Sequence, residues 1–236
     1  MTGLQAIGFD ADDTLWHCEK FFRLTEGLFA DMLRDHAAPE DLGARLIEAE
    51  RRNLARYGFG VKGFVLSMIE TAMDVTADRV PAHVLRRIIE AGHEMLEHPV
   101  DLLPHAAQTI EALHGQYALI LVTKGDLLDQ ERKLAASGLG DWFDRIEIVS
   151  DKTARVYAGV FADHGGAGAG LMVGNSMKSD VLPMIEAGGH GVFVPCNDTW
   201  ILEAAEAPEG DARFHEITHL GELPALTVRL SKGRSS

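Results

Sequence analysis

The sequence predicts an α/β protein with a Rossmann-like, five-stranded parallel sheet sandwiched by helices, and a four-helix cap domain inserted after the first strand. Two patterns lead to this expectation. In residues 1–16 and 101–236, short apolar runs alternate with helical segments, as they do when right-handed helical crossovers join parallel strands. Residues 17–100 show only helical periodicity and are far longer than one crossover requires. We therefore expect a core domain, 1–16 with 101–236, and a helical domain, 17–100.

Each predicted strand is an apolar run of the kind that is buried on both faces. The strands are "LQAIGF" (4–9), "YALILVT" (117–123), "RIEIVS" (145–150), "GLMVG" (170–174) and "HGVFVP" (190–195). The helices between them are "AAQTIEALHG", "LLDQERKLAASGLG", "KTARVYAGVFADHG" and "DVLPMIEAGG". The stretch "LSKGRSS" (230–236) is expected to be a frayed tail.

Apolar residues recur at three- and four-residue spacing in four segments of the helical domain. These segments are "FFRLTEGLFADMLRDH", "PEDLGARLIEAERRNLARYG", "VKGFVLSMIETAMD" and "PAHVLRRIIEAGHEML". The chain passes between the two domains twice, so we expect hinges near 15–17 and 99–104.

The charge and the apolar content limit the classes of partner. With 36 acidic and 22 basic residues the formal net charge is −14, which disfavours nucleic acid and anionic membranes as partners. No run reaches the ~18 apolar residues of a membrane helix, and no basic segment of a signal peptide precedes an apolar one. We expect a cytoplasmic protein, a monomer or a homodimer, whose two cysteines are reduced.

The stretch "IGFDADDTLW" (7–16) places three aspartates within four positions after the first strand. Residues i and i+2 of an extended chain face the same way, so Asp10 and Asp12 are expected to project together from the carboxyl end of the strand. Ligands of open parallel sheets bind at that edge. A divalent cation would offset the repulsion, with one carboxylate as nucleophile and the other as general acid and base. The alternative is an acidic turn that caps a helix.

The later strands end in residues suited to phosphoryl chemistry. Thr123 ends the second strand, Lys152 follows the third, and Asn175 and Asp180 follow the fourth. A hydroxyl donor, a cation and two oxygen ligands would then meet the aspartates at one edge, as phosphoryl transfer requires. Lys124 competes with Lys152 for the phosphate, but strand neighbours point to opposite faces. We therefore favour Lys152, and Lys124 stays a second candidate for substrate binding.

In these motifs the chain resembles the haloacid dehalogenase-like hydrolase superfamily over nearly its whole length. "DADDT" fits the D-x-D-x-T motif, with Asp10, Asp12 and Thr14 at the matching positions. Thr123 fits the hydroxyl motif, Lys152 the lysine motif, and "GNSMKSD" the final acidic motif.

The resemblance implies a Mg²⁺-dependent hydrolase of small phosphorylated metabolites. Asp10 would attack phosphorus to form an aspartyl-phosphate. Asp12 would protonate the leaving oxygen and later take a proton from water. Thr123 and Lys152 would hold phosphoryl oxygens. The implied metal ligands are Asp10, Asp12 with its backbone carbonyl, Asn175 and Asp180, directly or through water.

One departure from the family pattern concerns the metal. The final motif commonly begins with aspartate, whereas this chain has Asn175, whose amide oxygen ligates Mg²⁺ without adding charge. Asp12 argues against the dehalogenase branch, which lacks an aspartate there and works without metal. A phosphomutase, a phosphoacceptor signalling domain and a non-catalytic binding protein with a degraded metal site are the competing interpretations of the same residues.

The helical domain is expected to set the substrate, because caps in this superfamily reach over the active site. Within "RRNLARYGFGVKGF" (51–64), Arg56 and Lys62 are candidate substrate-binding residues. The alternative is a charged helix face followed by a turn broken by glycines. Trp16, just after the aspartates, is expected to line the pocket entrance.

Overall fold

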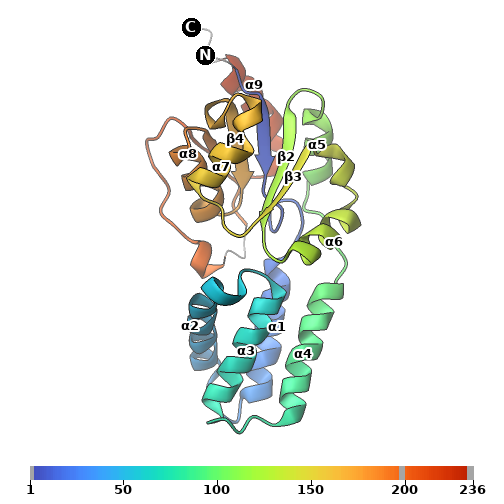
Figure 1. Cartoon of the computed structure of the whole chain (residues 1–236), viewed down its shortest axis with the longest axis vertical. Coiled ribbons are helices and arrows are strands. Elements are labelled where there is room, and N and C mark those ends of the chain that lie inside the picture. The colour runs from blue at the N-terminus through green and yellow to red at the C-terminus, as the bar shows by residue number, and fades with distance from the viewer. Residues whose placement is uncertain (1–2, 197–199, 233–236) are drawn as a thin grey trace. The chain divides into compact units, whose positions relative to one another are not determined.

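The computed structural model describes residues 3–196 and 200–232, and it divides into two compact units (Figure 1). The sheet unit comprises Met1–His17, Val100–Lys124 and Gln130–Ser236. The helical unit comprises Cys18–Pro99 with Gly125–Asp129. In the described part of the chain, no helix has the length and apolar character needed to cross a membrane.

Six strands of the described residues form one parallel sheet, in the order β3-β2-β1-β4-β5-β6. They are β1 (Ala6–Phe9), β2 (Ala118–Lys124), β3 (Arg145–Val149), β4 (Gly170–Gly174), β5 (His190–Phe193) and β6 (Phe214–Glu216). The predicted α/β class is confirmed, but the prediction of five strands is wrong. The missed strand, β6, has three residues, lies at the sheet edge and is at least partly exposed throughout, so it carries no apolar run.

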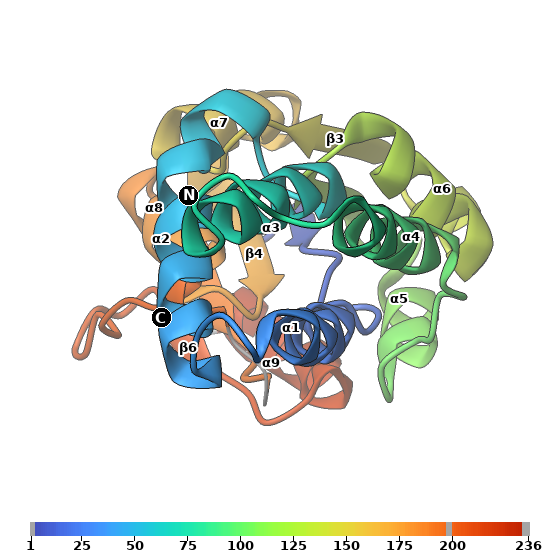
Figure 2. The ribbon, with the colours of Figure 1, turned by 90° about the horizontal axis from the view of Figure 1, so that it is seen from below.

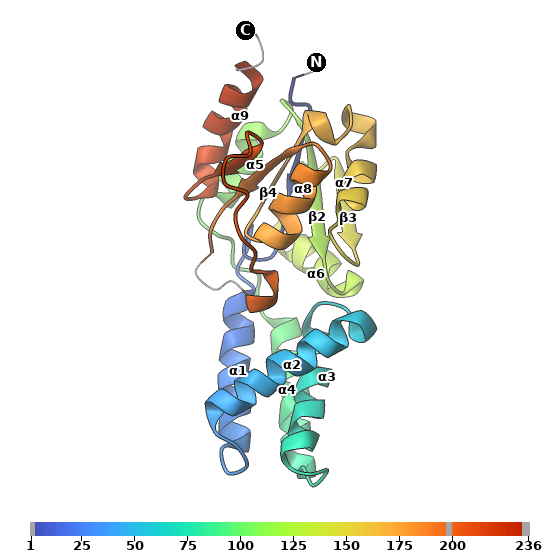
Figure 3. The ribbon, with the colours of Figure 1, turned by 90° about the vertical axis from the view of Figure 1, so that its left-hand side faces the viewer.

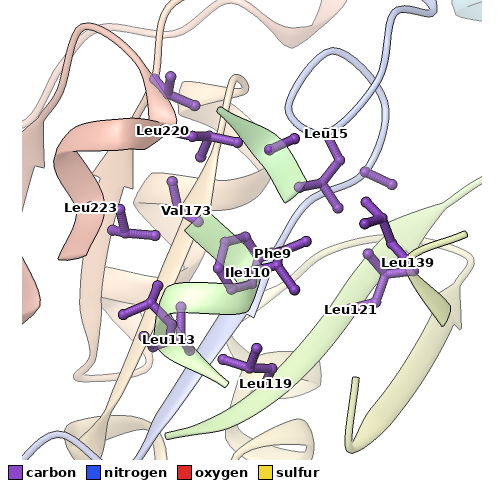
Figure 4. Close-up of a cluster of buried hydrophobic side chains, with 14 of the residues drawn as sticks. Phe9, Leu15, Ile110, Leu113, Leu119, Leu121, Leu139, Val173, Leu220 and Leu223 are labelled. Atoms are coloured by element: carbon purple, nitrogen blue, oxygen red, sulfur yellow. The ribbon is translucent and has the colours of Figure 1, made fainter. Parts of the chain in front are cut away.

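Helices cover both faces of the sheet (Figure 3). They are α5 (Ala106–Leu113), α6 (Leu127–Ser137), α7 (Ala154–Val160), α8 (Leu182–Glu186) and α9 (Leu223–Lys232). Alternate residues of β1 point to opposite faces of the sheet and pack there. Phe9 packs in one cluster with Ile110 of α5 and Leu223 of α9 (Figure 4), while Ala6 packs in another with Tyr157 of α7. This burial on both faces explains the continuous apolar runs of the inner strands.

The expected frayed tail is wrong in its first part. Leu230–Lys232 form the last turn of α9, whose Leu223 and Leu226 are buried three residues apart on one side of the helix. The rest of that tail, 233–236, lies outside the described residues.

The helical unit holds four helices in residues 18–99, all of which are described. They are α1 (Glu19–Leu33), α2 (Pro39–Tyr57), α3 (Val61–Val75) and α4 (Ala82–Glu97); Figure 2 views α1 and α4 nearly end-on. Pro39 occupies the first turn of α2, where its missing N–H costs nothing. Gly58, at φ +72°, ends that helix, and its N–H donates to Leu54 O at 3.0 Å. Phe29, Phe64 and residues from the other two helices form the unit's apolar core.

A histidine pair joins the edge strand β6 to its neighbour β5. The rings of His190 and His215 stack at 5.2 Å, with His190 Nδ1 3.0 Å from His215 Nε2. Burial, assisted by the Arg229 guanidinium, lowers the pKa of His215 below its ordinary value of 6.5. Folding therefore disfavours the protonated form of His215.

We expect this histidine to weaken the fold in mild acid. Because the unfolded chain binds the proton more readily, stability is full above about pH 6.5 and falls as the pH drops from there towards the folded pKa. Urea denaturation at a series of pH values should show a steeper loss for the wild type than for His215→Gln. Parallel losses in the two proteins would contradict the assignment.

Candidate active site

A tight turn after β1 sets the position of the first aspartate. The N–H of Asp10 donates to Val173 O at 2.9 Å, which extends the β1–β4 pairing by one residue. The Ala11 carbonyl then accepts the N–H of Thr14, at 3.2 Å. Asp13 adopts φ +59°, a left-handed conformation that aspartate tolerates better than most residues. The turn brings the Thr14 hydroxyl back to donate to Asp10 Oδ2 at 2.8 Å.

A buried lysine joins Asp10 to the motif after β4. Lys152 is 4% exposed, and its Nζ donates to Asp10 Oδ1 at 2.5 Å and to Asp180 Oδ1 at 2.7 Å. The other oxygen of Asp180 accepts the Ser176 N–H at 3.0 Å. A Cβ at position 174 would overlap the Asp180 carboxylate, so only glycine fits at Gly174. Three residues from distant parts of the sequence thus form one buried charged group.

This group contains two carboxylates and one ammonium. Burial lowers the pKa of Lys152, but the two carboxylates outweigh it and raise the pKa above its ordinary value, so the ammonium persists. Burial and then the Asp10 charge raise the pKa of Asp180 to about 7, against the opposing effect of Lys152. Lys152 is therefore the cation that permits Asp10 and Asp180 to lie together.

The two candidate lysines contact different residues. The Nζ of Lys124 donates to Glu203 Oε1 at 2.6 Å and to Ser179 Oγ at 2.7 Å, whereas Lys152 contacts Asp10. Thr123, one residue before Lys124, is buried at the end of β2. The roles of these residues in phosphate binding stay predictions.

The carboxylate of Asp12 faces α6. It accepts hydrogen bonds from Trp16 Nε1 at 2.7 Å, from Gln130 Nε2 at 2.8 Å, and from Lys133 Nζ at 2.7 and 2.8 Å. Burial raises the pKa of Asp12, but the Lys133 ammonium and the hydrogen bonds outweigh it, and the net pKa is lowered. Asp12 is thus held as a carboxylate. Trp16 is 1% exposed, so its indole packs in the core instead of lining an open entrance.

Three further residues contact the predicted groups and were missing from the sequence prediction. Gln130 and Lys133 are three positions apart and therefore share a face of α6, a signal that the sequence does contain. Glu203 accepts hydrogen bonds from Ser176 Oγ at 2.6 Å and Ser179 Oγ at 2.5 Å, which braces the motif after β4. Burial raises the pKa of Glu203, but Lys124 and the hydrogen bonds lower it below its ordinary value. Glu203 follows a stretch without helical or strand periodicity, so no pattern points to it.

The oxygen atoms beside Asp10 fit a hard cation. One terminal atom of the Asn175 amide lies 3.2 Å from Asp10 Oδ2 and 3.3 Å from the Asp12 backbone carbonyl oxygen. With the amide oxygen at that place, a carboxylate, a carbonyl and an amide present oxygen to one point, and these are the ligand types that Mg²⁺ takes. In the described residues no three His, Cys, Asp or Glu side chains gather as a metal site. Both oxygens of Asp180 are already hydrogen-bonded, to Lys152 and to Ser176, so this residue would act through water.

The two candidate residues of the helical unit lie on its surface. Arg56 is exposed in the last turn of α2. Lys62 is exposed at the start of α3, and its Nζ donates to Asp126 Oδ2 at 2.9 Å within the same unit. Their part in substrate binding stays a prediction.

The comparison with known families decides the identity. The model of the haloacid dehalogenase-like hydrolases matches residues 4–188, a range that contains Asp10, Lys152 and Asp180. The chain belongs to this family. For this hydrolase, the resemblance indicated by the motifs is therefore confirmed.

Two solved structures share the fold of the hydrolase, and one curated relative in sequence is named as a nucleotidase. A haloacid dehalogenase-like family hydrolase from Xanthomonas campestris is 38% identical, with a TM-score of 0.86 over 99% of this chain and 95% of that chain. The HAD-hydrolase YfnB from Bacillus subtilis, solved with bound magnesium, is 20% identical, with a TM-score of 0.65 over 96% of this chain and 99% of that chain; this likeness shows the fold alone. Pyrimidine 5'-nucleotidase YjjG from Escherichia coli K12 is 30% identical over 135 residues. That match covers 54% of this chain and 57% of the nucleotidase, so the chain spans little more than half of this curated relative.

Proposed function

We propose that this hydrolase cleaves small phosphate monoesters with Mg²⁺ and forms an aspartyl-phosphate on Asp10. The supporting observation is the surroundings of Asp10. Its Oδ1 accepts a hydrogen bond from the buried Lys152 ammonium, and its Oδ2 lies 3.2 Å from the terminal atom of the Asn175 amide that is also 3.3 Å from the Asp12 carbonyl oxygen. A nucleophile placed between a fixed cation and a cluster of hard oxygen ligands suits attack on an anionic phosphoryl group.

In the first step a carboxylate oxygen of Asp10 attacks phosphorus, and the bond from phosphorus to the leaving oxygen breaks. Lys152 offsets part of the charge that gathers there, with the Thr123 hydroxyl as a further donor. Asp12 gives a proton to the leaving oxygen. Mg²⁺, held by Asp10, the Asp12 carbonyl and Asn175, would supply additional positive charge against the repulsion between nucleophile and substrate.

In the second step water attacks the phosphorus of the aspartyl-phosphate and gives a proton to the Asp12 carboxylate, which releases phosphate and restores Asp10. The contacts of Asp12 with Lys133 favour its ionised form, which suits this step. Protonating the leaving group in the first step requires Asp12 to turn away from Lys133 and to carry a proton, which comes from solvent in the first turnover and from the attacking water of the preceding turnover afterwards.

Two competing activities differ from this one in their products. A dehalogenase would release halide from 2-haloacids and would need neither the Asp12 carboxylate nor the cluster of cation-binding oxygens. A phosphomutase would return the phosphoryl group to the sugar and release no free phosphate. Both are tested by assaying halide, phosphate and isomerised sugar phosphate in parallel.

The proposal is tested on a panel of sugar phosphates, phosphoglycolate and nucleoside monophosphates, with Mg²⁺ and with a chelator. Nucleoside monophosphates enter the panel because a relative is named as a pyrimidine 5'-nucleotidase. We expect phosphate release that the chelator abolishes. Halide release without metal, in place of phosphate release, would overturn the proposal.

The role of Asp12 predicts a dependence on the leaving group. In Asp12→Asn, phosphoenzyme formation from alkyl phosphates should slow by about 10²-fold or more, since general acid catalysis contributes about that much. Phosphoenzyme formation from aryl phosphates with acidic leaving groups should slow far less, because such groups leave unprotonated. The matched control is Asp13→Asn, which changes the neighbouring aspartate and keeps a side chain that tolerates φ +59°. Equal losses on both substrate types would remove the acid role from Asp12.

A further inference from the structure

Position 175 carries an amide at the point where the sheet unit gathers the proposed metal ligands. The inner atom of the Asn175 amide lies within 3.3 Å of both Asp10 Oδ2 and the Asp12 carbonyl oxygen. Neither of those atoms carries a hydrogen when Asp10 is ionised. With the amide oxygen inward, it accepts a long hydrogen bond from Thr14 Oγ1, at 3.4 Å, but three acceptors still face one another, an arrangement that favours a cation between them.

The same amide turned by 180° satisfies all three atoms without a cation. Its NH₂ then donates to Asp10 Oδ2 at 3.2 Å and to the Asp12 carbonyl at 3.3 Å. An amide carries a donor and an acceptor of nearly equal size, so the rotation needs no movement of the backbone. The backbone N–H of Asn175 stays fixed meanwhile by its hydrogen bond to Thr14 Oγ1, at 3.1 Å.

We propose that the Asn175 amide is a reversible plug for the metal site: its NH₂ faces inward in the metal-free protein and its oxygen faces inward when Mg²⁺ is bound. The inference rests on the metal of the proposed function. Mg²⁺ binding breaks the two hydrogen bonds of the inward NH₂ and turns the amide. These hydrogen bonds therefore stabilise the metal-free form and lower the affinity for Mg²⁺.

Aspartate at this position would reverse both properties. It has no donor, so it adds a third carboxylate to Asp10 and Asp180, which already share the single ammonium of Lys152. The metal-free protein would lose stability through like-charge repulsion. Mg²⁺ would bind more tightly, because the site gains a negative ligand and no hydrogen bonds are broken.

The first test compares the wild type with Asn175→Asp by calorimetric Mg²⁺ titration and by thermal unfolding in chelator. We expect the variant to bind Mg²⁺ at least about tenfold more tightly. In chelator it should unfold at a lower temperature than the wild type, and with saturating Mg²⁺ the difference should shrink or reverse. A variant with unchanged affinity and unchanged metal-free stability would overturn the plug.

The second test needs no folded variant. The side-chain NH₂ of Asn175 in the ¹⁵N-labelled wild type should exchange its hydrogens slowly in chelator, and should shift and exchange faster when Mg²⁺ is added. The matched control is Asn53 of the helical unit, a buried amide whose NH₂ donates to Ser67 Oγ at 3.2 Å. Its signals should not respond.

Two outcomes distinguish failure of the plug from failure of the proposed metal. If calorimetry detects Mg²⁺ binding while the Asn175 signals stay unchanged, the plug is wrong and the proposed metal stands. If the wild type binds no Mg²⁺, the metal of the proposed function is wrong, and the plug with it.

Discussion

Asp10→Asn is expected to lower phosphate release by at least about 10³-fold, as loss of a covalent nucleophile does, while the fold survives. An amide cannot form the acyl phosphate. The fold should persist because Lys152 keeps Asp180 as a partner, and a pair of one cation and one anion replaces two anions that share one cation. The measurements are steady-state phosphate release and urea denaturation of the same preparation.

The companion variant Asp151→Asn provides the control, since Asp151 is an exposed carboxylate next to Lys152 in the chain. It should retain activity near that of the wild type. Asp10→Asn activity within tenfold of the wild type would remove Asp10 from the reaction.

Lys152→Met is expected to have the largest effect on stability. The change leaves Asp10 and Asp180 buried side by side without their cation, and removal of one partner from a buried ion pair costs about 3–5 kcal/mol. Urea denaturation in chelator measures the loss. Lys178→Met, which removes an exposed lysine from the same motif region, should change the free energy of unfolding little.

A second change separates charge repulsion from lost packing. Adding Asp180→Asn to Lys152→Met removes one of the two stranded carboxylates and should recover part of the stability. If the double variant is no more stable than Lys152→Met alone, repulsion between Asp10 and Asp180 is not the cause of the loss.

The meeting of distant residues in the site could be predicted because parallel strands share an edge. Asp10, Lys152 and Asp180 follow β1, β3 and β4, and the apolar runs that locate those strands are unambiguous in the sequence. Three strand ends and one motif spacing were therefore enough to predict that a nucleophile, a cation and a second carboxylate lie together.

Two features could not be predicted: the direction of a side chain in the turn after β1, and a strand too short to form an apolar run. The rule that residues i and i+2 face alike holds for extended chain, but β1 ends at Phe9 and the turn that follows directs Asp12 towards α6. The spacing of Gln130 and Lys133 places them on one face of α6, but no sequence pattern states that this face meets the turn, so Lys133 was missed. Strand β6 escaped because three partly exposed residues do not form an apolar run.

The place of β1 in the sheet has a consequence for how the chain acquires its structure during synthesis. The apolar β1 is made before the helical unit, yet Ala6 pairs with Ala118 on one side and Gly170 on the other, so both neighbours are made only after the whole of Cys18–Pro99. Contacts of such long sequence separation form late, whereas the helices of Cys18–Pro99 depend on nearby partners. A nascent chain therefore carries an unpaired, wholly apolar strand ahead of the helical unit until β2 and β4 have been made, and an unpaired strand of this kind is open to aggregation and to chaperones.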